Sequence, residues 1–304
     1  MQPIRKAEVV TDTAAPAQPV TGVRIREIGT ADLAAVAALL TRGFAFRSEA
    51  YWLRGLERHA ARPRPAGFPV FGYCLDHGGV PVGVILLLFS TVQADDGAMI
   101  VRANVSSWYV EPPFRAFSSM LVRAATRDKS VTYFNITPAP HTWPQVEAQG
   151  FSVYCKGQIY AALALSRPQS GVTVGTFAES DVGGLTHYEA DLLRAHAGWG
   201  CLSIVARDAD RAYPFVFQKH RVKNVLPVYR LLYCRTIADL HRNAGNIGRF
   251  LARQGGVLVR LDANEPMRSI VGWYSDKRGR KYVKGPRPPH LGDLAFSEAA
   301  LFDG

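Results

Sequence analysis

The segment that decides the fold reads Trp108-Tyr-Val-Glu-Pro-Pro-Phe-Arg-Ala-Phe-Ser-Ser-Met-Leu-Val-Arg-Ala-Ala125. We expect a strand that ends at Val110, a turn marked by two prolines, and then a helix. Prolines suit a first helical turn, where the N–H groups have no partner within the helix. The apolar residues recur at i, i+3, i+7 and i+10, which is one face of a helix; they are Phe114, Phe117, Leu121 and Ala124.

The first turn of this helix predicts an anion site. A helix N-terminus presents unpaired amides and a partial positive charge, so it attracts phosphate groups. Small side chains would let a phosphate approach those amides, and an arginine adds a full charge. The residues of this turn that we expect to form the anion site are Arg115, Ala116, Phe117, Ser118, Ser119 and Met120.

This layout resembles the acyl-CoA-binding motif of the GNAT superfamily of N-acyltransferases. In that family the loop runs Arg/Gln-x-x-Gly-x-Gly/Ala, and its amides hold the pyrophosphate of coenzyme A. In this chain Ser118 and Met120 occupy the two glycine positions of that motif. The order of strand, turn and helix therefore matches the family, but the two glycines are absent. The resemblance implies acetyl-CoA or another acyl-CoA as co-substrate and a small-molecule amine as acceptor. It also implies that a backbone N–H near Val110 polarises the thioester carbonyl.

The length and composition of the chain indicate the broad class of protein to which it belongs. The chain has 304 residues, 48% apolar and 20% charged, which is typical of a soluble globular protein with one large domain or two ordinary ones. No apolar run approaches the ~20 residues that a membrane-spanning helix needs. Four scattered cysteines without a CxxC spacing predict neither a disulfide framework nor a metal site. We expect residues 1–20 to be a disordered leader without a secretory signal, and the protein to be cytoplasmic.

The net charge of +11 requires a partner or an explanation. A basic run interleaved with aromatic residues can bind nucleic acid. A solvated loop or hairpin is the commoner origin of such a run, and a basic surface equally suits the phosphates of CoA. The run comprises Lys277, Arg278, Arg280, Lys281, Lys284 and Arg287.

The chain contains two related halves. The segment 23–28 is expected as a strand and is followed by an amphipathic helix to about Leu40; 149 residues further on, 172–177 is followed by a second amphipathic stretch through Leu193. A repeat this long indicates domain duplication. We therefore predict an α/β (α+β) fold of two tandem GNAT-like domains, 21–165 and 166–304, each a mixed central sheet flanked by helices.

A rival phosphate loop lies in the second half. It reads Arg242-Asn-Ala-Gly245-Asn246-Ile-Gly248, with the glycines that the first half lacks and one extra residue between them. Glycines that merely serve turns explain the same pattern. Either half could therefore hold CoA.

Three side chains are catalytic candidates. The family's frequent general acid, a tyrosine four residues before a Gly-Phe pair, is Val146 in this chain. His141 and Glu147 lie on the helix that normally carries this tyrosine, and Glu111 adjoins the expected CoA loop. Each of the three could move a proton, and each could equally be a surface residue.

The predicted function is an acyl-CoA-dependent N-acyltransferase in which the amine attacks the thioester directly. A first alternative is a Fem-like transferase that uses aminoacyl-tRNA, since those enzymes also look like tandem GNAT domains and a basic run would serve RNA. A second alternative is a catalytically silent CoA-binding regulator, which Val146 in place of tyrosine would fit.

Overall fold

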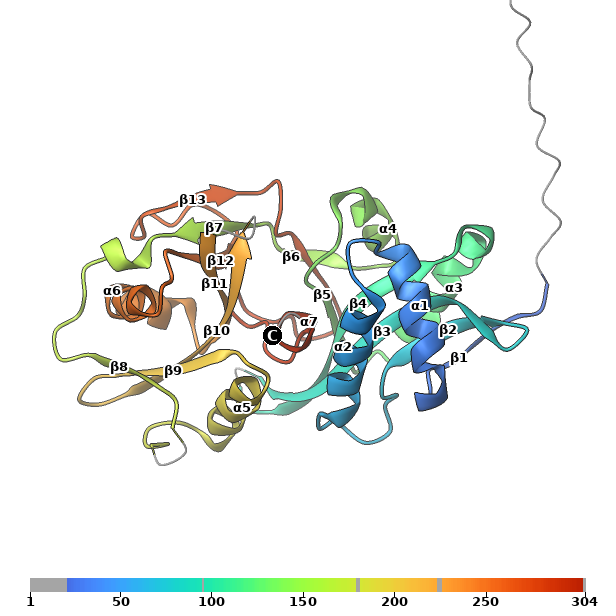
Figure 1. Cartoon of the computed structure of the whole chain (residues 1–304). Coiled ribbons are helices and arrows are strands. Elements are labelled where there is room, and N and C mark those ends of the chain that lie inside the picture. The colour runs from blue at the N-terminus through green and yellow to red at the C-terminus, as the bar shows by residue number, and fades with distance from the viewer. Residues whose placement is uncertain (1–20, 95, 179–180, 223–225, 303–304) are drawn as a thin grey trace, which may run out of the picture.

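The computed structural model describes residues 21–94, 96–178, 181–222 and 226–302. The leader expected over 1–20 lies outside these ranges. Within them the chain forms two seven-stranded sheets, each with helices on both faces (Figure 1).

The first sheet has the strand order β1-β2-β3-β4-β5-β14-β6. Its β4–β5 pair is parallel and its other pairs are antiparallel, so the sheet is mixed. The strands are β1 (Val23–Glu27), β2 (Gly72–His77), β3 (Val80–Gln93), β4 (Met99–Val110), β5 (Thr132–Asn135), β14 (Lys281–Lys284) and β6 (Ser152–Cys155).

The second sheet repeats this pattern in the order β8-β9-β10-β11-β12-β7-β13. Its single parallel pair, β11–β12, stands where β4–β5 stands in the first sheet. The strands are β8 (Thr173–Thr176), β9 (Leu202–Arg207), β10 (Ala212–Val222), β11 (Leu226–Cys234), β12 (Leu258–Ala263), β7 (Gly157–Ala161) and β13 (Gly272–Ser275).

The two sheets exchange one strand. β7 follows β6 along the chain but lies in the second sheet between β12 and β13. β14 lies in the first sheet between β5 and β6. The halves 21–165 and 166–304 therefore do not each complete their own sheet.

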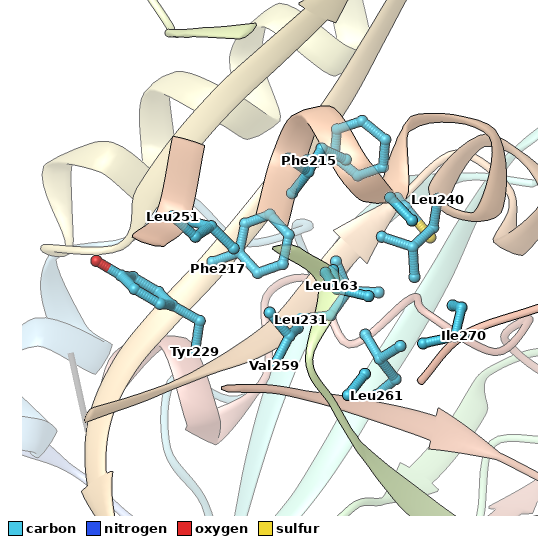
Figure 2. Packing of buried hydrophobic residues seen from close by; sticks show 14 of the residues in the cluster. Leu163, Phe215, Phe217, Tyr229, Leu231, Leu240, Leu251, Val259, Leu261 and Ile270 are labelled. Atoms are coloured by element: carbon cyan, nitrogen blue, oxygen red, sulfur yellow. The ribbon is translucent and has the colours of Figure 1, made fainter. Parts of the chain in front are cut away.

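Helices cover both faces of each sheet. On the first sheet, α1 (Leu33–Gly43) and α2 (Glu49–Ala61) bury one face, and α3 (Ser118–Ala125) and α4 (Trp143–Ala148) bury the other. On the second sheet, α6 (Ile237–Arg253) packs on one face, as Figure 2 shows, and α5 (His187–Gly198) packs on the opposite face. The remaining helical segments are η1 (Thr30–Asp32), η2 (Pro112–Phe117), η3 (Pro140–Thr142), η4 (Leu163–Leu165) and α7 (Glu298–Leu301).

The structure confirms the predicted fold class. Both sheets are mixed and flanked by helices, and β1 and β8 are matching edge strands. Among the described residues, no helix combines the length and apolar character that crossing a bilayer requires.

Candidate functional site

A cavity of about 630 Å³ opens beside the point where β4 and β5 part. Its walls come from the α1–α2 connection, the second half of β4, the segment between β5 and α4, and the C-terminal helix α7. Aromatic rings dominate the lining; they are Phe44, Phe46, Tyr51, Trp52, Trp108, Tyr109 and Phe302. A cavity of this size with a few polar groups among aromatic rings is typical of a small-molecule site.

The shape of β4 creates this opening. β4 and β5 pair only over Arg102–Asn104 and Thr132–Phe134. Beyond that point the pairing of β4 with β3 shifts register, and Ser107 adopts a left-handed φ of 45°. Such a β-bulge redirects the backbone and frees it from the ladder. β4 therefore faces the cavity with Val105–Tyr109, whereas Val110 is buried against β3 and is not part of the lining.

Glu298 of α7 reaches into the gap between the two strands. Its backbone N–H donates to Asn104 Oδ1 at 2.7 Å, and its carboxylate accepts hydrogen bonds from the hydroxyls of Ser106 and Thr137. Within the described residues, it is the single carboxylate on the cavity wall. Hydrogen bonds donated to a carboxylate favour its ionised form.

The segment that carries Glu298 is held by a buried ion pair. Arg102 Nη1 and Nη2 donate to the two carboxylate oxygens of Asp293 at 2.6 and 3.0 Å, and Nη2 also donates to the carbonyl of Ala295 at 3.3 Å. Burial acts to raise the pKa of Asp293, but the Arg102 charge and hydrogen bonds outweigh it and lower that pKa. The pair ties the C-terminal segment to β4 just before Glu298.

The structure brings one of the three predicted catalytic residues to the cavity. His141, exposed on η3, lines it. Glu111 instead forms an ion pair with Arg42 at 2.7 Å, and Glu147 accepts a hydrogen bond from the Tyr282 hydroxyl at 2.7 Å. Neither of these two carboxylates is part of the lining.

The residues expected to hold CoA form the 3₁₀ segment η2 and the start of α3. Arg115 is exposed and lines the cavity, and Ala116, Ser119 and Met120 are exposed beside it. Phe117 and Ser118 are half-buried. The N–H of Phe114 is already bonded to the carbonyl of Glu111, so this helix start has fewer open amides than the sequence predicted.

The rival loop is not a loop, which corrects the sequence-based expectation. Arg242, Gly245, Asn246 and Gly248 all lie within α6, whose N-cap is Thr236. A Cβ on Gly245 would lie 2.5 Å from the carbonyl oxygen of Ser166, so this glycine permits close packing of two backbones.

The polar residues of this stretch also serve the fold. Asn246 donates to the carbonyls of Gln169 and Val172 at 3.1 and 3.2 Å, and Arg242 pairs with Asp208 at 3.4 Å. The Asn246 contacts hold the chain before β8 onto α6, and the Arg242 pair joins α6 to the β9–β10 connection.

We expect Gly248→Ala to cost about 2–3 kcal/mol of unfolding free energy, because overpacking forces backbone shifts. A Cβ at this position would lie 2.2 Å from backbone atoms of Leu163 and Ala164. Gly198 is the matched control, a helical glycine on α5 with nothing within 4 Å of a built Cβ. Gly198→Ala should be neutral or gain up to about 1 kcal/mol. Equal urea midpoints for the two variants would rule out close packing at Gly248.

The basic run does not form a continuous exposed patch. Lys281 is buried and bonded to Asp262 at 2.6 Å, Arg280 lies over the Trp143 ring at 3.9 Å, and Arg287 pairs with Asp96 at 3.0 Å. Lys284 donates to Thr126 and to the carbonyl of Gln149. Lys277 and Arg278 are exposed. Much of this positive charge therefore holds the exchanged strand β14 in place.

The sequence missed Glu298, Ser106 and Thr137. Glu298 lies 192 residues from Ser106 along the chain and precedes an ordinary Ala-Ala-Leu stretch. No local spacing marks it, and its contacts with β4 and with the residues after β5 depend on the tertiary fold. In the described part of the chain, no group of three or more His, Cys, Asp or Glu side chains is arranged to hold a metal ion.

Comparison with known proteins supports the fold. No protein-family model and no curated protein matches the sequence. A GCN5-related N-acetyltransferase from Anabaena variabilis is similar with a TM-score of 0.55 and 10% identity, over 86% of this chain and 72% of that one. A candidate N-acyltransferase from Enterococcus faecalis is similar with a TM-score of 0.57 and 11% sequence identity, over 90% of this chain and 74% of that one.

A candidate acetyltransferase from Pyrococcus horikoshii matches over nearly its whole length. Its TM-score is 0.53 at 12% identity, covering 94% of this chain and 97% of that one. At such identities the likeness shows the fold alone. The chain thus has the fold of the GCN5-related N-acetyltransferases, built on two sheets that exchange a strand.

Proposed function

We propose that this protein is an acyl-CoA-dependent N-acyltransferase whose acceptor amine binds in the aromatic cavity. The observation that carries the proposal is the position of Glu298. This carboxylate lies where β4 leaves β5, on the wall of a cavity that Arg115 of the expected CoA loop also lines. A proton acceptor and a cofactor-binding residue thereby share one site.

The transfer requires a neutral amine. The amine nitrogen attacks the thioester carbonyl carbon, a C–N bond forms, the C–S bond breaks, and one proton leaves the nitrogen. Glu298 takes that proton, held in position by the hydroxyls of Ser106 and Thr137. β4 lines the cavity around the bulge at Ser107, and a backbone N–H of this segment would donate to the carbonyl oxygen as negative charge develops.

The CoA thiolate must then be protonated. Val146 is buried on α4 and lines the cavity, so the tyrosine typical of this fold has no replacement on that helix. His141 is the histidine on the cavity wall, and an imidazolium can donate a proton to a thiolate. We assign His141, in its protonated form, the donation of a proton to sulfur; Glu298 then releases its proton to solvent and His141 takes one up from solvent, which restores both groups.

The contacts of the basic run argue against the tRNA-dependent alternative. That hypothesis rested on a free basic run, and Arg280, Lys281, Lys284 and Arg287 have partners within the protein. The silent CoA-binding regulator stays distinguishable by experiment, because it would bind CoA without releasing thiol.

The test is release of free CoA from acetyl-CoA and longer acyl-CoAs, measured with a thiol reagent across a panel of amines. We expect thiol release that depends on the amine and equals the amide formed by mass spectrometry, with aromatic and aliphatic amines preferred because rings line the cavity. Binding of CoA without amine-dependent release would identify the regulator instead. Absence of CoA binding would refute both.

A further inference from the structure

The second sheet carries two arginines side by side on its parallel strands. Register places Arg230 of β11 opposite Arg260 of β12, and neighbouring strands lie about 4.8 Å apart. Arg230 is 6% exposed and its Nε has no hydrogen-bond partner. No salt bridge to either arginine is found among the described residues.

Three further residues continue this row across the sheet. Gln218 of β10 lies opposite Arg230, Tyr160 of β7 lies opposite Arg260, and Trp273 of β13 lies opposite Tyr160. The Tyr160 and Trp273 rings stack at 6.0 Å between centroids. The Nε2 of Gln218 is buried and has no partner. One face of five adjacent strands thus presents unused hydrogen-bond donors beside two rings.

This face is the one that α6 does not cover. The residues that alternate with the row, among them Phe217, Tyr229 and Val259, point into the core beneath α6 (Figure 2). Because side chains alternate along a strand, the row faces the opposite way. In the first sheet, both α1 and α2 cover the corresponding face. In the second sheet, α5 is the one helix that the structure describes between β8 and β9, and it packs on β9 and β10.

The row runs from a closed end to an open one. Gln218 is 3% exposed, Arg260 and Tyr160 are half-buried, and Trp273 is 68% exposed. The accessible end of the row is therefore the β13 edge, where Trp273 lies.

Arg260 shares a hydrogen bond with the Tyr160 side chain, but in the part of the chain that the structure describes neither arginine has an ion-pair partner. Burial and the neighbouring Arg230 lower the pKa of Arg260 to about 10. Asp262 lies on the same face, but Lys281 binds its carboxylate at 2.6 Å. Two guanidinium groups and this balanced pair leave a net excess of positive charge, and unpaired buried charge is costly.

We propose that Gln218, Arg230, Arg260, Tyr160 and Trp273 form a binding site for a small ligand that carries a carboxylate or phosphate group. Guanidinium groups bind both oxyanions through paired N–H donors. The Gln218 amide and the Tyr160 hydroxyl add donors at either side, and the Trp273 ring covers an apolar part of the ligand. The site is separate from the cavity at Glu298 and does not depend on acyl transfer.

The test is the melting temperature of the full chain in inorganic phosphate or in succinate, against sodium chloride at equal ionic strength. At ten times its Kd, an oxyanion should raise the midpoint by about 2 °C for a chain of this size. Comparing the two anions identifies the preferred group. Arg230→Met and Arg260→Met should each abolish the shift, and Arg230→Met should also raise the midpoint without ligand because it removes an unpaired buried charge.

Two control variants test whether the rise in melting temperature comes from binding at Arg230 and Arg260. Arg253→Met changes an exposed arginine on α6 and should keep the full shift. Arg115→Ala should keep it too, which separates this site from the expected CoA loop. The proposal is refuted if neither oxyanion acts beyond chloride, if the shift survives in both Arg230→Met and Arg260→Met, or if Arg115→Ala removes it.

Discussion

Glu298→Gln is expected to lower kcat/KM for acyl transfer by about 100- to 1000-fold, because the amide cannot accept the amine proton. Affinity for acetyl-CoA should be unchanged, since the proposed role of Glu298 is to accept the proton of the amine. The amide keeps the size of the carboxylate, and the Ser106 and Thr137 hydroxyls can rotate to bond it, so the fold should persist. Steady-state thiol release measures the effect.

Two further variants distinguish a role of Glu298 in proton transfer from a role in stabilising the fold. Glu147→Gln changes an exposed carboxylate outside the cavity and should leave kcat/KM unchanged. Formate should restore part of the activity of Glu298→Ala, because a small carboxylate can occupy the space that the truncation leaves. A purely structural role would lower the melting temperature of Glu298→Ala without any rescue by formate. Wild-type kcat/KM in Glu298→Gln would remove Glu298 from the mechanism.

Asp293→Asn should cost about 3–5 kcal/mol, because it leaves Arg102 buried without a counter-charge. For a chain of this size, that loss corresponds to a fall in melting temperature of about 5–8 °C. Both side chains are almost fully buried, with exposed side-chain fractions of 4% and 10%. Activity should fall as well, because the pair positions the segment that carries Glu298.

The stabilising effect of the Arg102–Asp293 pair should weaken as pH falls. The pKa of Asp293 is lowered in the folded protein, so the pair stabilises the fold above the ordinary aspartate pKa of about 4 and loses that effect as pH falls below it. The difference between wild type and Asp293→Asn should therefore shrink in acid.

An exposed ion pair provides the comparison for this variant. Asp96→Asn breaks the exposed pair with Arg287 and should cost less than about 1 kcal/mol. Arg102→Met combined with Asp293→Leu should recover much of the lost stability, since replacing both partners removes the uncompensated charge. Equal losses for the exposed and buried pairs would contradict the anchoring role of Asp293.

The sequence predicted the strand at 23–28, the helix that follows it and the strand that ends at Val110, because hydrophobic pattern and turn residues determine them locally. Gly78 and Gly79 form the β2–β3 turn, where both have positive φ, so local residues determine this hairpin as well. Helix α2 was missed although its signal is present. Ser48 caps it, and Trp52, Leu56 and His59 recur at helical spacing on its buried face.

The exchanged strands and the cavity could not be predicted from sequence. β7 and β14 have ordinary strand patterns, and which sheet they join depends on contacts between distant segments. The glycines of α6 had the spacing of a phosphate loop, but helix packing explains them. Glu298 enters its site through the tertiary path of the C-terminal segment, which no local pattern encodes.

The central claim is that CoA binds the first half, at Arg115, so that its thioester enters the cavity beside Glu298. Calorimetric titration of acetyl-CoA into Arg115→Ala and Arg242→Ala tests it most directly. Arg115→Ala should weaken binding about tenfold or more, since a hydrogen bond to a charged group is worth roughly 1.5–3 kcal/mol. Arg242→Ala, on α6, should match wild type. Unchanged affinity in Arg115→Ala together with a loss in Arg242→Ala would place CoA on the second half and contradict the account.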